Sequence, residues 1–303
     1  MSIIFISLLS GSCTGEPDAI FVDFSNPMVV ERSGNGSRNH PYFEVAVGSI
    51  ISARETVVHY HELLEYIAAK LGREIKLVQR KTYSEINQLI SAGRIDLAFI
   101  CSGPYASGRE KFGFEALAMP RVRGSHLYQS YLIVNKDSPI QTLADLRGKV
   151  FAFTDPESNT GKLVPIYWLG LAGNKPEKFF GKTIYTYSHD NSIMAVARSL
   201  VDGAAVNGQV WEYYHRRDPV FTAKTRIIRK SEPFGNPPVV ASSRLPSETK
   251  ERMRDLLFNM HQNPEGRRIL KKLLIDRFIP PIEESYDPIR AMKKNVAPEV
   301  GMQ

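Results

Sequence analysis

Outside its extreme N-terminus the chain has one cysteine, Cys101, in the stretch DLAFICSGPY. Residues 97–100 are continuously apolar, which is typical of a buried strand, and the Cys-Ser-Gly-Pro sequence that follows indicates a turn. A thiol at the end of such a strand can pack as a small apolar group, or it can bind a soft ligand. If Cys13 is lipidated or removed with a signal segment, Cys101 remains a free thiol.

A polar turn in the stretch FTDPESNTGKLVP could bind an anion. A predicted strand ends at Thr154, and residues 158–161 lead into a predicted helix. Hydroxyls and free N–H groups at a helix N-terminus attract anions, although an ordinary N-cap explains the same residues. The Gly-Lys-Ser/Thr sequence of a nucleotide-binding loop is absent from this stretch, so it does not indicate a nucleoside triphosphate.

The stretch YSHDNS places His189, Asp190 and Ser192 at the start of another predicted helix. If both turns follow parallel strands, they lie at one edge of the sheet, where ligands bind. A helix start with a satisfied imidazole would give the same pattern. Cys101 and His189 could also form a nucleophile–base pair, but the sequence supplies no third, orienting group. We therefore keep a cysteine-dependent enzyme only as a remote alternative, and expect no cofactor.

The elements around these turns alternate between strands and helices. EIKLVQR and IDLAFI are typical strands, and ETVVHYHELLEYIAAKLG is an amphipathic helix that we expect to end at Gly72. This alternation predicts βαβ units and a parallel sheet. A second α/β section follows SYLIVNKDSPI, and 303 residues can bury a large core. We predict two α/β lobes with a ligand cleft between them.

The charge of the chain is moderately positive, with a formal net charge of +7. Basic residues alternate with acidic ones or occur in short pairs, which is typical of solvated helix faces. No nucleic-acid-binding motif accompanies them, so we expect no nucleic-acid partner. A weak positive field would still help to gather small anions. No apolar run reaches the roughly 18 residues that a transmembrane helix needs.

The N-terminal stretch MSIIFISLLSGSC resembles the end of a secretion signal. Small residues precede Cys13, as in lipoprotein signals, but no basic residue precedes the apolar run. We interpret residues 1–40 as a signal or lipoprotein-like segment and a linker, with a disordered start as the alternative. We accordingly expect export to the periplasm, with the mature protein either lipid-anchored through Cys13 or free.

Four stretches together resemble the PhnD-like family of periplasmic phosphate-, phosphite- and phosphonate-binding proteins: DLAFICSGPY, YLIVNKDSPIQTLADLRGK, FTDPESNTGKLVP and YSHDNSIMAVARSLVDGAAV. The resemblance implies the type II periplasmic-binding-protein fold, a monomer and no enzyme activity. We expect lobe 1 at residues 41–134 and 238–303, lobe 2 at 135–237, and hinge strands at 131–135 and 239–242.

The resemblance also implies a set of ligand-binding residues. The oxyanion loop corresponds to residues 158–161, and the family's oxyanion-contacting histidine to His189. The family's carboxylates for an amine correspond to Gln209 and Pro237, which argues against an aminoalkyl ligand. The full predicted ligand-binding set is Cys101, Ser102, Tyr83, Tyr105, Tyr128, Ser158, Asn159, Thr160, Gly161, His189 and Asp190.

Cys101 leaves two ligand classes open. The AioX-type arsenite sensors are a branch of this family that uses a pocket cysteine. Arsenite is uncharged at neutral pH and condenses with a thiol, losing water as the As–S bond forms. On the thiol alone we favour arsenite bound through arsenic to Cys101, with signalling to a membrane histidine kinase. The alternative is the substrate-binding component of a phosphite, phosphonate or phosphate ABC transporter, with a permease as partner.

Overall fold

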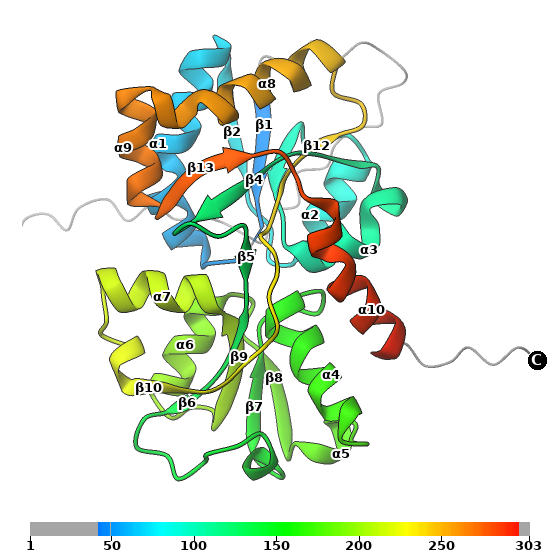
Figure 1. Cartoon of the computed structure of the whole chain (residues 1–303), viewed down its shortest axis with the longest axis vertical. Helices are drawn as coiled ribbons and strands as arrows, with labels where there is room; N and C mark the ends of the chain where they lie inside the picture. Colours follow the sequence, from blue (N-terminus) through cyan, green and yellow to red (C-terminus); the bar gives the residue numbers. More distant parts are fainter. Residues whose placement is uncertain (1–41, 49, 297–303) are drawn as a thin grey trace, which may run out of the picture. The chain divides into compact units, whose positions relative to one another are not determined.

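The computed structural model describes residues 42–48 and 50–296. Within these residues the chain forms two mixed α/β lobes, each built on one large β-sheet, which confirms the predicted fold class (Figure 1). The segment 1–40, with the predicted signal and Cys13, lies outside the described residues. No helix in the described part of the chain combines the length and the apolar character needed to cross a membrane.

The sheet of lobe 1 has six strands, and its central strands are apolar on both faces because helices cover both. Alternate residues point to opposite sides. Val45 and Leu97 pack with helices α1, α8 and α9, whereas Ala46 and Ala98 pack with α2 and α3. The strand order is β13 (Ile275–Ile279), β4 (Phe114–Val122), β12 (Val239–Ser242), β3 (Leu97–Phe99), β1 (Tyr42–Val47) and β2 (Glu74–Val78). The helices are α1 (Ala53–Leu71), α2 (Tyr83–Ser91), α3 (Ser102–Phe112), α8 (Ser247–Asn259) and α9 (Pro264–Lys272).

The sheet of lobe 2 has five strands and follows the same logic. Ile133 and Ala204 pack with α6 on one face, and Leu132 and Phe151 pack with α4 on the other. The strand order is β10 (Thr225–Lys230), β6 (Ser130–Asn135), β9 (Gly203–Asn207), β7 (Val150–Phe153) and β8 (Lys182–Tyr185). The helical segments are η1 (Ala144–Leu146), η2 (Asn159–Leu163), α4 (Val164–Leu171), α5 (Pro176–Phe179), α6 (His189–Ala197), α7 (Gly208–Arg217) and η3 (Thr222–Lys224).

The chain passes between the two lobes at a short antiparallel ribbon of β5 (Leu127–Tyr128) and β11 (Phe234–Gly235). This corrects two expectations. β6 pairs with β9 and β10, so residues 130–134 belong to the second sheet and not to lobe 1. The expected hinge strands 131–135 and 239–242 are instead inner strands of the two sheets, each paired on both sides. The physical reason is that an apolar strand buried on both faces does not indicate which sheet it joins.

The C-terminal helix α10 (Asp287–Val296) contacts both lobes. It follows η5 (Glu283–Tyr286) and packs against α3 of lobe 1 and against η2 and α4 of lobe 2 (Figure 1). The predicted lobe 1 section 238–303 therefore includes a helix that spans the junction. The remaining short segment, η4 (Met260–Gln262), joins α8 to α9.

Local sequence signals explain several helix ends. Gly72 takes the left-handed conformation at the end of α1 (φ 65°), as expected for a C-cap glycine. Thr82 and Glu85 form a reciprocal capping box that fixes the start of α2. The Thr82 cap places Tyr83, a residue of the predicted site, at the first position of α2.

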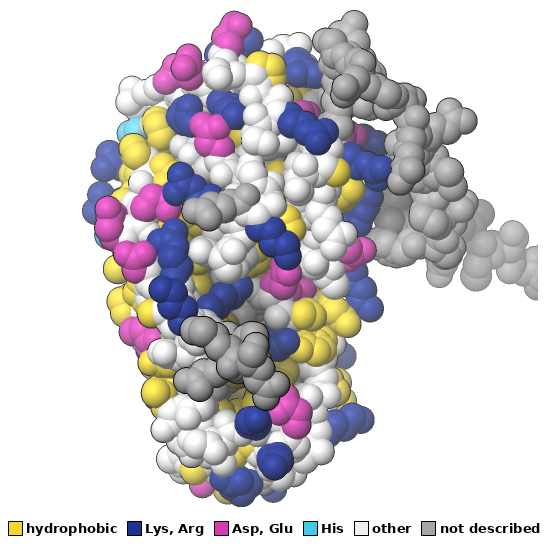
Figure 2. Space-filling view, turned by 90° about the vertical axis from the view of Figure 1, so that its right-hand side faces the viewer, with side chains coloured by type: hydrophobic (Ala, Val, Ile, Leu, Met, Phe, Trp, Pro, Cys, Tyr) yellow, Lys and Arg dark blue, Asp and Glu magenta, His cyan; other side chains and the backbone are white. Residues whose placement is uncertain are grey.

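Charged side chains are mixed on the face shown in Figure 2. Lysine and arginine side chains lie among aspartate and glutamate side chains, separated by apolar and uncharged polar surface. The mixture on this face agrees with the alternating charges of the sequence.

Candidate functional site

The predicted oxyanion loop forms the N-terminus of a helix. Ser158 is the N-cap residue, and its side chain accepts a hydrogen bond from the Gly161 N–H at 3.0 Å. The helix begins with the π turn η2 and continues directly into α4. Gly161 has no room for a side chain, because a Cβ there would lie 2.3 Å from Thr154 Oγ1. The glycine thus allows the loop to lie directly against the end of β7.

Two buried polar atoms of this loop have no hydrogen-bond partner. Asn159 is fully buried and Thr160 is 1% exposed, yet Asn159 Oδ1 and Thr160 Oγ1 are both unpaired. Unpaired buried polar atoms are costly, and in native proteins they call for an explanation such as an absent ligand or water. The two atoms are therefore candidate contacts for a polar ligand.

His189 is the first residue of α6 and is held in one tautomer. Its Nδ1 accepts the Asn207 N–H at 3.1 Å and lies 3.1 Å from Thr154 Oγ1. Because Nδ1 accepts from a backbone N–H, the proton of the neutral ring is on Nε2. Burial lowers the pKa of His189 to about 3. At neutral pH this side chain is an uncharged hydrogen-bond donor.

Lobe 1 contributes hydroxyls and the thiol to the same place. Tyr128 Oη shares a short hydrogen bond with Ser102 Oγ and receives the Asn159 Nδ2 hydrogen bond at 3.2 Å. The Cys101 sulfur is an acceptor for the backbone N–H groups of Asn159 and Gly103. Burial raises the pKa of Cys101 above its ordinary value, so the thiol is protonated at neutral pH. Burial also raises the pKa of Tyr83, whose hydroxyl is hydrogen-bonded to Ser158.

Asp155 and its neighbours tie the two lobes together around this cluster. Asp155 Oδ2 accepts the backbone N–H of Tyr83 at 3.1 Å, and burial raises the pKa of this carboxyl. Asn87 Nδ2 donates to Glu157 Oε2 at 2.8 Å. Gly103 lies so close to the opposite loop that a Cβ there would meet the Glu157 carbonyl oxygen at 2.8 Å. The lobes are therefore in direct contact on this side.

Four helices begin at this contact, because four cluster residues are the first residues of helices. Tyr83 is the first residue of α2, Ser102 of α3, Asn159 of η2–α4, and His189 of α6. Each helix N-terminus carries a partial positive charge. The convergence of four N-termini on one buried cluster favours a negatively charged ligand without requiring a formal positive charge.

The structure brings together most of the predicted site residues. The following lie in the cluster: Tyr83, Cys101, Ser102, Tyr128, Ser158, Asn159, Thr160, Gly161 and His189.

Two predicted residues have other partners. The Tyr105 hydroxyl donates to Glu283, and its ring packs edge-on against Tyr286. Asp190 Oδ1 accepts the backbone N–H of Ser52 at 2.9 Å, which is a contact between lobes. A tyrosine in a helix can face the core, and an aspartate in a first turn can bind backbone N–H groups, so residue type alone did not distinguish these roles.

Three residues of the cluster were missed: Thr154, Asp155 and Asn207. Thr154 and Asn207 both approach His189 Nδ1, and Asp155 joins the lobes. Each stands at the end of a strand, immediately before a turn or helix, and that position was the available signal.

The fold and the site define a two-lobed α/β binding protein of the periplasmic type, with a buried polar cluster between the lobes. The sequence profile described as "ABC transporter, phosphonate, periplasmic substrate-binding protein" matches residues 45–286. The chain therefore belongs to this family, as the resemblance implied; membership of its arsenite-sensing branch is not established by the match.

Relatives agree with this assignment. The phosphonates-binding periplasmic protein of Escherichia coli is 29% identical over 215 residues, which cover 69% of this chain and 63% of that protein. The phosphate-import protein of Mycolicibacterium smegmatis is 25% identical over 211 residues, with 65% of each chain covered. The matched segments thus span slightly less than two thirds of these relatives.

Solved structures share the fold. A binding-protein component of an ABC phosphonate transporter from Pseudomonas aeruginosa superposes with a TM-score of 0.80 at 25% identity, covering 86% of this chain and 91% of that chain. A Prochlorococcus marinus protein in complex with methylphosphonate superposes with a TM-score of 0.75 at 20% identity, covering 84% and 98%. The Escherichia coli and Pseudomonas aeruginosa relatives are both named as binding proteins.

Proposed function

We propose that this chain is the periplasmic substrate-binding component of an ABC transporter for a phosphorus oxyanion, a phosphonate or phosphate. The observation that carries the proposal is that four helices begin at a buried cluster in which the Thr160 hydroxyl, a hydrogen-bond donor, has no partner. A membrane permease is the partner that binds the closed form. This was the alternative function expected from the sequence, and family membership supports it better than arsenite sensing.

The chemistry of the cluster suits an oxyanion held by neutral donors. The protonated Nε2 of His189 and the hydroxyl of Thr160 can each donate to an anionic oxygen. Because His189 is uncharged, it adds no positive charge to the site at neutral pH, and the helix N-termini supply the electrostatic attraction. Closing the lobes then buries the anion among donors from both sides.

Calorimetry with phosphate, phosphite and methylphosphonate tests this function. We expect the wild type to bind at least one of them, and Thr160→Val to weaken binding by about 1.5–3 kcal/mol, the range for a hydrogen bond to a charged group. Thr160→Ser is the matched control, because it keeps the hydroxyl and should keep most of the affinity. If the folded wild-type protein binds none of these anions, the proposal is wrong.

Arsenite capture is the second candidate, and the position of Cys101 within the cluster favours it. The described residues contain this single cysteine, and its thiol is protonated at neutral pH, which suits condensation with neutral arsenite. The converging helix N-termini, in contrast, give a neutral ligand no electrostatic advantage. Arsenite titration of the wild type and of Cys101→Ser distinguishes the two ligands. If arsenite binding is lost in the serine variant and neither protein binds a phosphorus oxyanion, the ligand is arsenite, and sensing through a histidine kinase becomes the function to test.

A further inference from the structure

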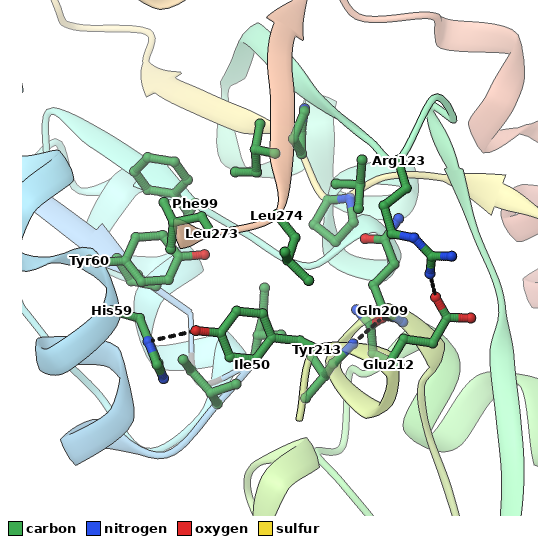
Figure 3. Close-up of a pocket in the computed structure, with 18 of the residues that line it drawn as sticks. Ile50, His59, Tyr60, Phe99, Arg123, Gln209, Glu212, Tyr213, Leu273 and Leu274 are labelled. Atoms are coloured by element: carbon green, nitrogen blue, oxygen red, sulfur yellow. Dashed lines mark hydrogen bonds and ion pairs between the residues drawn. The ribbon is translucent and has the colours of Figure 1, made fainter. Parts of the chain in front are cut away.

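A pocket of about 150 Å³ lies between the lobes next to the polar cluster (Figure 3). The two sites share a wall. Asn207 lines the pocket and donates its N–H to His189 Nδ1, and the carbonyl of Ile50, another lining residue, accepts the His189 N–H at 3.0 Å. A ligand held in the cluster therefore has this pocket beside it.

The lining of the pocket is mainly apolar. Lobe 1 contributes Val47, Ile50, Tyr60, Phe99 and Leu274, among others, and lobe 2 contributes Val210 from the first turn of α7. Figure 3 shows Phe99 and Tyr60 on one side of the space, Gln209 on the other, and Leu274 between them. Such a surface stabilises an apolar group by removing it from water.

Two polar side chains of the lining, Glu212 and Gln209, already have partners. Glu212 is the one carboxylate among the described lining residues, and it is paired with Arg123 and with the Tyr131 hydroxyl. Gln209 Nε2 donates to Asn236 Oδ1 at 2.8 Å. An ammonium group in this pocket would lose its hydration and would have to compete with Arg123 for Glu212.

Leu274 provides an independent sign of a shaped site. Its backbone adopts the left-handed conformation, with a φ of 57°, which is unfavourable for a residue other than glycine. The residue follows the end of α9, where glycine is the usual choice, and its side chain lies in the pocket. Strained backbone positions that persist tend to occur at functional sites.

We propose that this pocket takes the uncharged, apolar organic group of a phosphonate whose oxyanion binds in the cluster. The proposal rests on the proposed function and narrows its substrate class to alkyl- and arylphosphonates. An engineered apolar cavity of about 150 Å³ binds benzene, so a phenyl or short alkyl group matches the available space. Aminoalkylphosphonates are disfavoured, because the pocket gives their charge no free partner.

Calorimetry with phosphate, methyl-, n-butyl-, phenyl- and 2-aminoethylphosphonate tests the proposal. We expect affinity to increase up to about fourfold for each methylene buried beyond methylphosphonate, and phenylphosphonate to bind at least tenfold tighter than 2-aminoethylphosphonate. Val210→Phe should fill the pocket and lower the ratio of phenylphosphonate to phosphate affinity about tenfold. Val220→Phe is the matched control, because Val220 is 58% exposed and lies outside the pocket lining, and it should leave this ratio unchanged.

The outcomes separate the two proposals. If no phosphorus oxyanion binds, the proposed function fails and the pocket proposal with it. If phosphate or methylphosphonate binds but phenyl- and butylphosphonate bind no tighter, or if Val210→Phe leaves the ratio unchanged, the transporter function stands and the pocket proposal is overturned. Binding of 2-aminoethylphosphonate as tight as that of phenylphosphonate would also overturn it.

Discussion

At the scale of single residues, the burial of His189 couples protein stability to pH. Its pKa is lowered to about 3 in the folded protein, whereas the unfolded chain has the ordinary value near 6.5. Between these values the unfolded chain binds a proton that the folded protein does not, so stability falls as the pH falls from about 6.5 toward 3.

This gives a direct test. The free energy of unfolding of the wild type should fall by up to about 1.4 kcal/mol per pH unit through His189 in this range, and His189→Asn should remove that part of the slope. Urea unfolding between pH 4 and pH 7 measures it. His61→Asn is the control for the loss of a histidine, because the His61 side chain is 63% exposed. Identical slopes for the wild type and His189→Asn would show that His189 is protonated in both states.

The residues of the cluster could be predicted from the sequence where their type was unusual for their position. A thiol at a strand end and a Ser-Asn-Thr-Gly turn before a helix are uncommon enough to stand out. Thr154 and Asn207 were missed because hydroxyl and amide residues at strand ends are ordinary, and only their shared approach to His189 distinguishes them. Tyr105 and Asp190 show the opposite case, since their polar atoms bind Glu283 and Ser52.

At the scale of the elements, the tight contact between η2 and β7 makes Gly161 sensitive to a single methyl group. In Gly161→Ala the Cβ would meet Thr154 Oγ1 at 2.3 Å, and Thr154 is itself hydrogen-bonded to His189. We expect a loss of about 1–3 kcal/mol of stability from overpacking, together with weaker oxyanion binding. Thermal unfolding and calorimetry measure both quantities.

The same helix offers a matched control for this substitution. Gly170 in α4 has open space where a Cβ would lie, with no heavy atom of another residue within 4 Å, and its φ is not positive. Gly170→Ala should therefore raise stability by up to about 1 kcal/mol, through better helix propensity. If Gly161→Ala proved as harmless as Gly170→Ala, the loop would have to be looser than its contacts indicate.

Helices were easier to predict than sheet membership. The apolar periodicity of α1 and its terminal Gly72 identify the helix and its end, because both signals are local. Strand β6 is buried along almost its whole length, so its sequence does not indicate which strands pair with it. β6 pairs with β9 and β10, which lie about 70 and 95 residues further along the chain, so this pairing depends on the whole fold. For this reason the observed boundary of lobe 1 differs from the predicted one.

At the scale of the whole molecule, a few hydrogen bonds join the two lobes. Asp190 binds the Ser52 N–H, Asn87 binds Glu157, and Asp155 binds the Tyr83 N–H. A ligand can shift the balance between open and closed forms only through contacts that differ between them. The same holds for a substitution, so removing one inter-lobe hydrogen bond should favour the open form by the free energy of that bond.

Asp190→Ala tests this coupling, because the Asp190 carboxylate accepts the Ser52 N–H across the lobes. We expect the closed form to lose about 1.5–3 kcal/mol, the range for a hydrogen bond to a charged group. In small-angle scattering the ligand-free variant should have a larger radius of gyration than the wild type, and saturating ligand should restore the wild-type value at the cost of weaker affinity.

The control for this substitution is Asp145→Ala. Asp145 also accepts backbone N–H groups at a helix start, from Gln141 and Thr142, but entirely within lobe 2. The Asp145→Ala variant should have a lower free energy of unfolding but the same radius of gyration as the wild type. If both variants keep the wild-type radius without ligand, the inter-lobe hydrogen bonds are too weak to hold the closed form. The buried apolar contacts between the lobes must then stabilise it, and ligand affinity should be insensitive to Asp190.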